Sequence, residues 1–328
     1  MRSAEMIELW RGDMRESLHA GHAVICDAHG VVEAWGRPGQ VIYPRSSCKM
    51  IQALPLIESG AADAAGLTDR QLALACASHS GAAMHVAAVD GWLTGLGLGE
   101  SDLRCGSHMP RDPEENRRLT CSDTAPCQLH NNCSGKHAGF LTLNRHLKGG
   151  PDYVEPDHPV QRAVKEAFEA VTDEESPGFG IDGCSAPNWA CTVEGLARAM
   201  ARFANPGADR RGQAMRRLVD AMRSHPEMVA GEGRSCTELM RAMGGVAAIK
   251  TGAEAVFVAI LPDQGLGVAL KITDGGTRAS EAAITALLIH LGVLDAAHPA
   301  AQALLDGPIL NCRGMVTGNL RRAPGFPA

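Results

Sequence analysis

Strand-like sequence near both ends of the chain encloses a long region with helical periodicity. Residues 20–26 and 31–35 are rich in β-branched and apolar residues, and Asp27-Ala28-His29-Gly30 between them supplies turn chemistry, which predicts a hairpin. Strand-like runs return late in the chain, at 246–249, 255–261 and 267–272. Two strand-rich ends are most simply united in one antiparallel sheet. The sequence therefore predicts an α+β fold in which helices flank the sheet and a helical lobe is inserted.

The central region has the spacing expected of helices. Thr68-Asp69-Arg70-Gln71 has the pattern of a capping box before a short helix. Helical periodicity follows at 83–96, 135–148, 158–172, 192–204, 210–224 and 235–243, and again at 278–291. We expect a sheet lobe made of residues 1–45 and 245–328, including C-terminal helices, and a mostly helical lobe of residues 46–244. The stretch 99–128, rich in Arg, Asp, Pro and Cys, is expected to be irregular.

Composition narrows the classes of function. Lys and Arg number 31 against 37 Asp and Glu, giving a net charge of −6 without a basic run, which disfavours nucleic acid and anionic membranes as partners. The first residues lack a secretion-signal pattern, and the longest apolar stretch, around 282–294, is too short to span a bilayer. We expect a cytoplasmic protein. Its eleven cysteines are an odd number and do not describe a disulfide framework.

A serine and a lysine are spaced as a nucleophile and its activating amine in Arg45-Ser46-Ser47-Cys48-Lys49. An apolar run follows, so Ser46 is expected in the first turn of a helix with Lys49 on the same face. A serine hydroxyl becomes a good nucleophile when a nearby neutral amine takes its proton. The alternative interpretation is a capping serine beside a solvated lysine, since this spacing is common by chance.

A second box supports the catalytic interpretation. Lys250-Thr251-Gly252 lies at the end of a predicted strand, where the glycine permits close approach to the backbone. A helix-start S-x-x-K followed by a strand-borne K-T-G is the pattern of penicillin-recognising serine enzymes. On that pattern Ser134-Gly135-Lys136 would be the middle box, with Lys136 as a proton shuttle and the neighbouring cysteines as core residues.

Five ordered segments also resemble a narrower family, the Rhizobium etli-type L-asparaginases. They are Tyr43 to Lys49, Cys76 to Ser80, Asn132 to His137, Gly180 to Cys184 and Lys250 to Glu254. The resemblance covers roughly residues 20 to 320. It implies a fold like that of the serine β-lactamases and penicillin-binding proteins, and hydrolysis of L-asparagine to L-aspartate and ammonia. It also implies two catalytic pairs, Ser46 with Lys49 and Ser78 with Lys250.

The same resemblance implies a metal site and substrate contacts. Zinc would be held by Cys133, Lys136 and Cys184, and substrate would contact Arg45, His137 and Asp182. This chain departs locally from the family, with Cys48 inside the S-x-x-K box and Ser80-Gly81 after His79. We expect a homodimer acting on a small molecule.

Several alternatives stay open at this point. The chain can be another serine amidase or β-lactamase-like hydrolase of the same fold, a non-catalytic sensor that binds an amino acid, or a zinc hydrolase whose metal activates water. The division of labour between Ser46 and Ser78 is also open. We favour Ser46 as the nucleophile because it holds the helix-start position.

Overall fold

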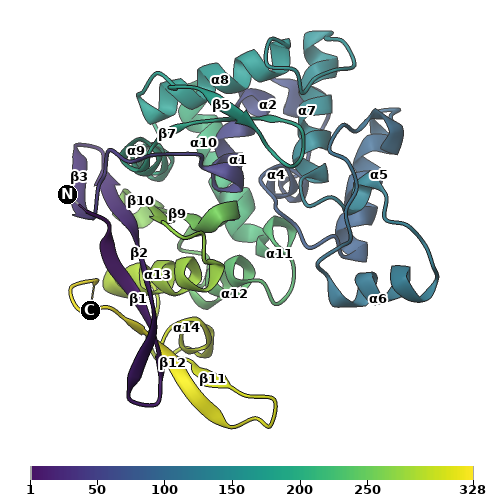
Figure 1. Ribbon diagram of the computed structural model, residues 1–328. Helices are drawn as coiled ribbons and strands as arrows, with labels where there is room; N and C mark the ends of the chain where they lie inside the picture. The colour runs from purple at the N-terminus through teal and green to yellow at the C-terminus, as the bar shows by residue number, and fades with distance from the viewer. Residues whose placement is uncertain (1, 328) are drawn as a thin grey trace. The chain divides into compact units, whose positions relative to one another are not determined.

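The computed structural model describes residues 2–327, and Figure 1 shows its ribbon. The chain forms two compact units, each assembled from separate stretches of sequence. Unit 1 comprises Met1–Ser47, Cys191–Asn205 and Glu238–Ala328, and unit 2 comprises Cys48–Ala190 and Pro206–Thr237. The two units are described in turn.

Unit 1 is built on an antiparallel sheet to which both ends of the chain contribute. The strand order is β11-β12-β1-β2-β10-β9-β8, with β3 pairing on β2 as an eighth strand. In the register, Ile7 of β1 lies opposite Arg322 of β12. This arrangement confirms the predicted α+β class and the sheet shared by the chain ends. The strands are β1 Ala4–Arg11, β2 Met14–Asp27, β3 Gly30–Trp35, β8 Ala248–Gly252, β9 Val256–Leu261, β10 Leu266–Ile272, β11 Pro308–Leu310 and β12 Val316–Arg322.

Two helices pack on this sheet, α9 (Val193–Ala204) and α13 (Thr277–His290). Every residue of β9 is buried, as expected for a strand covered on both faces. Helix α9, which the lobe boundaries above assign to the helical lobe, lies in unit 1 because its apolar face packs against β10 and β2. Smaller elements complete the unit: β4 Val41–Ile42 paired with β7 Cys191–Thr192, the 3₁₀ helices η4 Ala253–Ala255 and η5 Pro262–Gln264, and α14 Pro299–Leu304.

Unit 2 is mostly helical and is arranged around α7 (Ser134–Leu147), which is buried from Ser134 to Asn144. A Cβ on Gly135 would lie 2.4 Å from the carbonyl oxygen of Leu74, so only glycine allows this close packing. The other elements are α1 Lys49–Gln52, α2 Leu54–Glu58, α3 Ala61–Ala64, α4 Asp69–Ala75, α5 Ala83–Gly95, α6 Pro113–Cys121, α8 Pro159–Thr172, α10 Arg210–Ser224, α11 Pro226–Val229, the 3₁₀ helices η2 Glu100–Asp102 and η3 Gln128–His130, and the hairpin of β5 Phe179–Ile181 and β6 Pro187–Trp189. Helix α12, Ser235–Ala242, contributes residues to both units.

One expectation about this region was wrong. The stretch 99–128 is not irregular throughout, since it contains the nine-residue helix α6. Asp112 caps this helix by accepting the Glu115 backbone N–H at 2.9 Å, and Pro113 occupies the first turn. Asp-Pro-Glu-Glu is therefore a helix-start signal that the overall polarity of the stretch obscured.

Among the helices of residues 2–327, none combines the length and apolar character needed to cross a bilayer.

Candidate active site

Ser46 lies in a tight helical turn of unit 1. The 3₁₀ helix η1, Arg45–Cys48, runs directly into α1, so Ser46 occupies the first turn as predicted. Ser47 fixes the turn because both its Oγ and its N–H donate to the Pro44 carbonyl, at 2.7 and 3.2 Å. Arg45 has a φ of 53°, a conformation that costs a non-glycine residue about 1 kcal/mol or more. Such local strain is frequent where a side chain must be held in a particular direction.

The K-T-G strand lies against this turn. A Cβ on Gly252 of β8 would lie 2.7 Å from the Pro44 carbonyl oxygen and 3.0 Å from the Ser47 nitrogen, so glycine is required for the contact. Lys250 on the same strand is fully buried and donates from Nζ to the Thr251 carbonyl at 2.8 Å. Unit 1 thus brings the backbones of two predicted boxes together, although about 200 residues separate them in sequence.

A hollow of about 460 Å³ in unit 1 adjoins the serine turn through Arg45. Charged groups of both signs line it, including Arg45, Lys271 and Glu254. Lys271 donates from Nζ to the Glu254 carbonyl, and burial lowers the pKa of Lys271. The sequence reasoning missed Lys271 and Glu254 as candidate site residues. Glu254 directly follows the K-T-G-A run and could have been suspected, whereas Lys271 is recognisable only from strand pairing.

In unit 2, Lys49 is the centre of a buried polar cluster. Its side chain is 1% exposed, and Nζ lies 3.1 Å from both Ser78 Oγ and Cys133 Sγ, while also donating to the Ala77 carbonyl. Three acceptors match the three N–H groups of an ammonium, so the amine must give up one of these bonds to act as a base. The family resemblance implies a pair of Ser78 with Lys250, whereas the structure brings the Ser78 hydroxyl to the Lys49 amine.

Long-range backbone bonds position Ser78. The Ser78 N–H donates to the Val229 carbonyl at 2.9 Å, and the next N–H, that of His79, donates to Asn132 at 3.2 Å. His79 itself is fully buried, with ring nitrogens bonded to the Ser134 hydroxyl and the Gly81 N–H. These contacts make His79 part of the scaffold that holds the loop. No local sequence pattern encodes these long-range hydrogen bonds, so the orientation of the Ser78 side chain could not be predicted from the sequence.

The predicted metal ligands come together in unit 2. Lys136 Nζ lies 3.0 Å from Cys184 Sγ, and a hydrogen bond between the two cysteines raises the pKa of Cys133 to about 12 and lowers that of Cys184 well below its usual value. Burial disfavours the Lys136 charge, but the Cys184 and Cys133 sulfurs outweigh this effect and raise its pKa. Two sulfurs and an amine so arranged fit a three-ligand zinc site. Residues 2–327 hold no group of three His, Cys, Asp or Glu placed to bind a metal, and the ligand set that the resemblance implies includes the Lys136 amine beside the two thiols.

A tight turn delivers Cys184 to this cluster. The Asp182 N–H donates to the Ala186 carbonyl at 2.9 Å, its carboxylate accepts the Gly183 N–H at 2.7 Å, and Ser185 has a φ of 69°. Asp182 is half-buried and its charge acts on Lys136. His137, the other predicted substrate contact in unit 2, is fully buried; burial lowers its pKa well below the usual value, and its Nδ1 is hydrogen-bonded to the Tyr153 hydroxyl at 2.9 Å.

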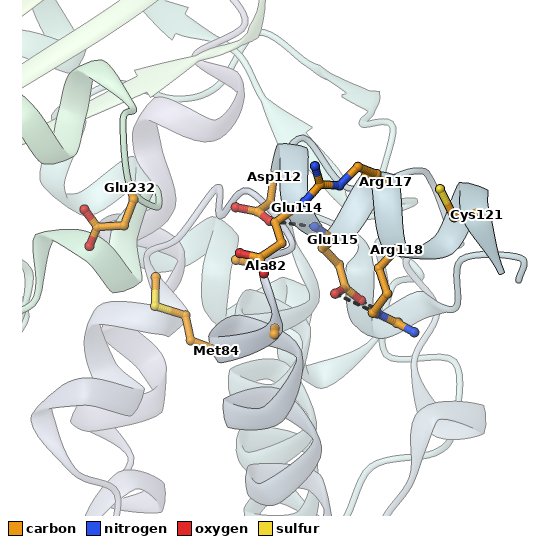
Figure 2. Close-up of a pocket in the computed structure, with 10 residues that line it drawn as sticks. Ala82, Met84, Asp112, Glu114, Glu115, Arg117, Arg118, Cys121 and Glu232 are labelled. Carbon is orange, nitrogen blue, oxygen red and sulfur yellow. Dashed lines mark hydrogen bonds and ion pairs between the residues drawn. The ribbon is translucent and has the colours of Figure 1, made fainter.

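A larger hollow in unit 2, of about 710 Å³, contains none of the predicted site residues (Figure 2). Its lining includes Asp112, Glu114, Arg117 and Glu232. The larger hollow is therefore not where the predicted catalytic and metal-binding groups lie. The sulfur and amine groups lie in the buried cluster around Lys49 and Lys136.

Comparison with known proteins identifies the family. A family profile described as L-asparaginase II matches residues 7–322. None of the curated proteins compared with this chain matches it. Similar solved structures include a β-lactamase from Mycobacterium bovis, with 12% identity over 80% of this chain and 89% of that one and a TM-score of 0.43. They also include Mglu in its glutamate form, with 13% identity over 84% and 61% and a TM-score of 0.48. Because the profile match spans nearly the whole sequence, the chain belongs to the L-asparaginase II family and is an amidohydrolase.

Proposed function

We propose that this amidohydrolase converts L-asparagine to L-aspartate and ammonia through a serine nucleophile. The observation that carries the proposal is the gathering of Ser78 and Cys133 around the buried Lys49 amine. These residues come from three separate segments that resemble the family. A hydrophobic core that served packing alone would not bring a hydroxyl, a thiol and an amine together. The family and the segments that resemble asparaginases support asparagine as the proposed substrate.

In the proposed mechanism, the Ser46 hydroxyl attacks the side-chain amide carbon of asparagine. Lys49, three residues along the chain, accepts the hydroxyl proton once its amine is neutral. Ser78, hydrogen-bonded to Lys49, relays that proton towards the leaving nitrogen. Ammonia leaves an aspartyl ester on Ser46, and water then hydrolyses the ester by the same proton transfers in reverse. Backbone N–H groups near Ser46 and in the strand after Lys250 would stabilise the oxyanion by about 3–4 kcal/mol per donor.

The charged hollow in unit 1 supports recognition of an amino acid. A guanidinium binds a carboxylate with two parallel hydrogen bonds, which suits Arg45 to the α-carboxylate of the substrate, with Lys271 as a second positive group. Glu254 offers a negative charge for the α-ammonium in the same hollow. Asp182 and His137 remain predicted substrate contacts through the family resemblance, with Lys250 a second catalytic lysine.

Zinc fits the cluster of Cys133, Lys136 and Cys184, which would hold it with a fourth position open. When bound, the ion would supply a fixed positive charge that can anchor or polarise a substrate oxygen. Lys136 and Cys184 are already in contact, and the turn after β5 would position Cys184 for the ion.

Metal binding can be measured without reference to activity. We expect about one zinc per chain after dialysis against a zinc buffer, determined by elemental analysis. Cys184→Ser should weaken zinc binding by more than about a hundredfold, because even changes outside the direct ligands cost 10–100-fold. Cys312→Ser, at an exposed cysteine, should bind zinc normally. Equal zinc content in both variants would rule out this ligand set.

The proposed activity is tested by ammonia release from asparagine, glutamine and a control without substrate. We expect release from asparagine to exceed that from glutamine, and no preference for nitrocefin, a chromogenic lactam. Preferential nitrocefin hydrolysis would instead indicate a lactamase. Tight asparagine binding without ammonia would indicate a sensor. The homodimer and the cytoplasmic location are further proposals, the first of which sedimentation at several protein concentrations tests.

A further inference from the structure

A second cluster of reactive groups lies in unit 2, on the segment that joins α6 to α7. Cys127 Sγ is 3.2 Å from His130 Nδ1, and His130 Nε2 is 3.2 Å from Glu115 Oε1. Arg118 holds the Glu115 carboxylate with two hydrogen bonds, at 2.6 and 3.0 Å (Figure 2). A thiol, an imidazole and a carboxylate are thus connected in series through the two ring nitrogens.

The hydrogen bonds assign the protons within this series. His130 Nδ1 lies 3.1 Å from the backbone nitrogen of Cys127 and 3.3 Å from the Cys127 carbonyl oxygen, while Nε2 faces the Glu115 carboxylate. We assign the ring proton to Nε2, since a carboxylate is the stronger acceptor, so that Nδ1 accepts the Cys127 N–H. Glu115 and His130 are each 5% exposed. The hydrogen bond from Arg118 lowers the pKa of Glu115, which therefore stays ionised and can stabilise a protonated imidazole. His130 is placed to accept the thiol proton of Cys127.

Other cysteines of the chain lack this arrangement. Cys127 is half-buried, whereas Cys121 and Cys312 are more exposed, and the hydrogen bonds of residues 2–327 include none from a histidine ring to either of them. Burial raises the pKa of the Cys105 thiol and that of the Cys48 thiol, each to about 12. If exposure alone governed reactivity, Cys121 and Cys312 would react fastest; if activation by a base governs it, Cys127 would.

We propose that Cys127 is a modification site at which the thiol, activated by His130 and Glu115, forms mixed disulfides with low-molecular-weight disulfides. The thiol proton passes to His130 Nδ1, and the thiolate attacks one sulfur of the small disulfide. A sulfur–sulfur bond to Cys127 forms as the original sulfur–sulfur bond breaks. The departing thiolate takes up the proton from His130, so one thiol is consumed and one is released. This site is independent of the proposed asparagine chemistry.

The test uses the native full-length protein and glutathione disulfide as the probe. Occupancy of each cysteine is followed in time by peptide mass spectrometry near pH 7. We expect Cys127 to react about five- to tenfold faster than Cys121 or Cys312, because the His130 ring nitrogen 3.2 Å from its sulfur can take up the thiol proton.

His130→Gln removes the base but keeps a polar side chain of similar size. It should slow modification of Cys127 to the rate of Cys121 while leaving the rates of Cys121 and Cys312 unchanged. The buried Cys105 should stay unmodified, which checks that the variant is folded. Glu115→Gln should give an intermediate rate. The proposal is overturned if Cys127 reacts no faster than Cys312, or if its rate is the same with and without the His130 imidazole.

Discussion

Replacing Ser46 by alanine is expected to lower kcat for asparagine hydrolysis by about a thousandfold or more. Without the hydroxyl no aspartyl ester can form, and only positioning and charge stabilisation of a direct attack by water would remain. The measurement is ammonia release at saturating asparagine. Because Ser46 is half-buried in its turn and other contacts fix that turn, the variant should fold normally.

Ser47→Ala is the matched control, on the neighbouring residue. It removes the hydroxyl bond to the Pro44 carbonyl but keeps the Ser47 N–H bond to the same oxygen, so it should cost about 1 kcal/mol of stability and lower kcat far less than Ser46→Ala does. Acid quenching during turnover should trap an aspartyl group on the peptide that contains Ser46. Trapping on the peptide of Ser78 instead, or near-normal turnover by Ser46→Ala, would reassign the nucleophile.

Replacing Gly267 by alanine is expected to destabilise unit 1 by about 3 kcal/mol or more. A Cβ at this position of β10 would lie 2.0 Å from the Ala201 nitrogen and 2.5 Å from the Ala197 carbonyl oxygen, both backbone atoms of α9. No side-chain rotation can relieve the clash, so the helix must move off the sheet. Chemical denaturation followed by circular dichroism measures the loss, and reduced soluble expression should accompany it.

Gly39→Ala provides the control in the same unit. No atom lies within 4 Å of a Cβ there, and the residue is not in the left-handed region, so stability should change by no more than about 0.5 kcal/mol. If the two alanine variants unfolded at the same denaturant concentration, α9 would not pack on β10 as closely as described.

The sequence predicted most of the architecture because its strongest signals are local. The helices at 83–96 and 210–224 and the hairpin of β2 and β3 form where periodicity and turn residues indicate. Helix α9 was assigned to the other lobe because its periodicity identifies a helix but not the partner of its apolar face. Strands β1 and β12 are not evident in the sequence because neither shows the regular polar–apolar alternation of a half-buried strand: β1 has four consecutive buried residues and β12 is mostly polar. Pairing between the two ends of the chain stabilises them.

The sequence predicted the site residues that belong to a recognisable motif. It did not predict how their side chains are oriented, because tertiary contacts determine that. Spacing alone indicated Ser46 with Lys49, and resemblance indicated the cysteines and Lys136. The distance between Lys49 and Ser78 depends on backbone bonds to Val229, which no residue pattern encodes. For the cluster of Cys127, His130 and Glu115, the only sequence pattern is a cysteine three residues before a histidine, which is weak. Its carboxylate, Glu115, lies in a helix that was not predicted because the surrounding sequence is so polar.

The pairing of β1 with β12 also determines when this protein can finish folding in a cell. At about 5–20 residues per second, roughly 15 to 60 seconds of synthesis separate the emergence of the two strands from the ribosome. During that interval one side of β1 has unpaired backbone groups that can recruit a strand from another chain. Nascent chains stalled before residue 316 would therefore depend on a chaperone to stay apart, even with residues 48–190 already synthesised.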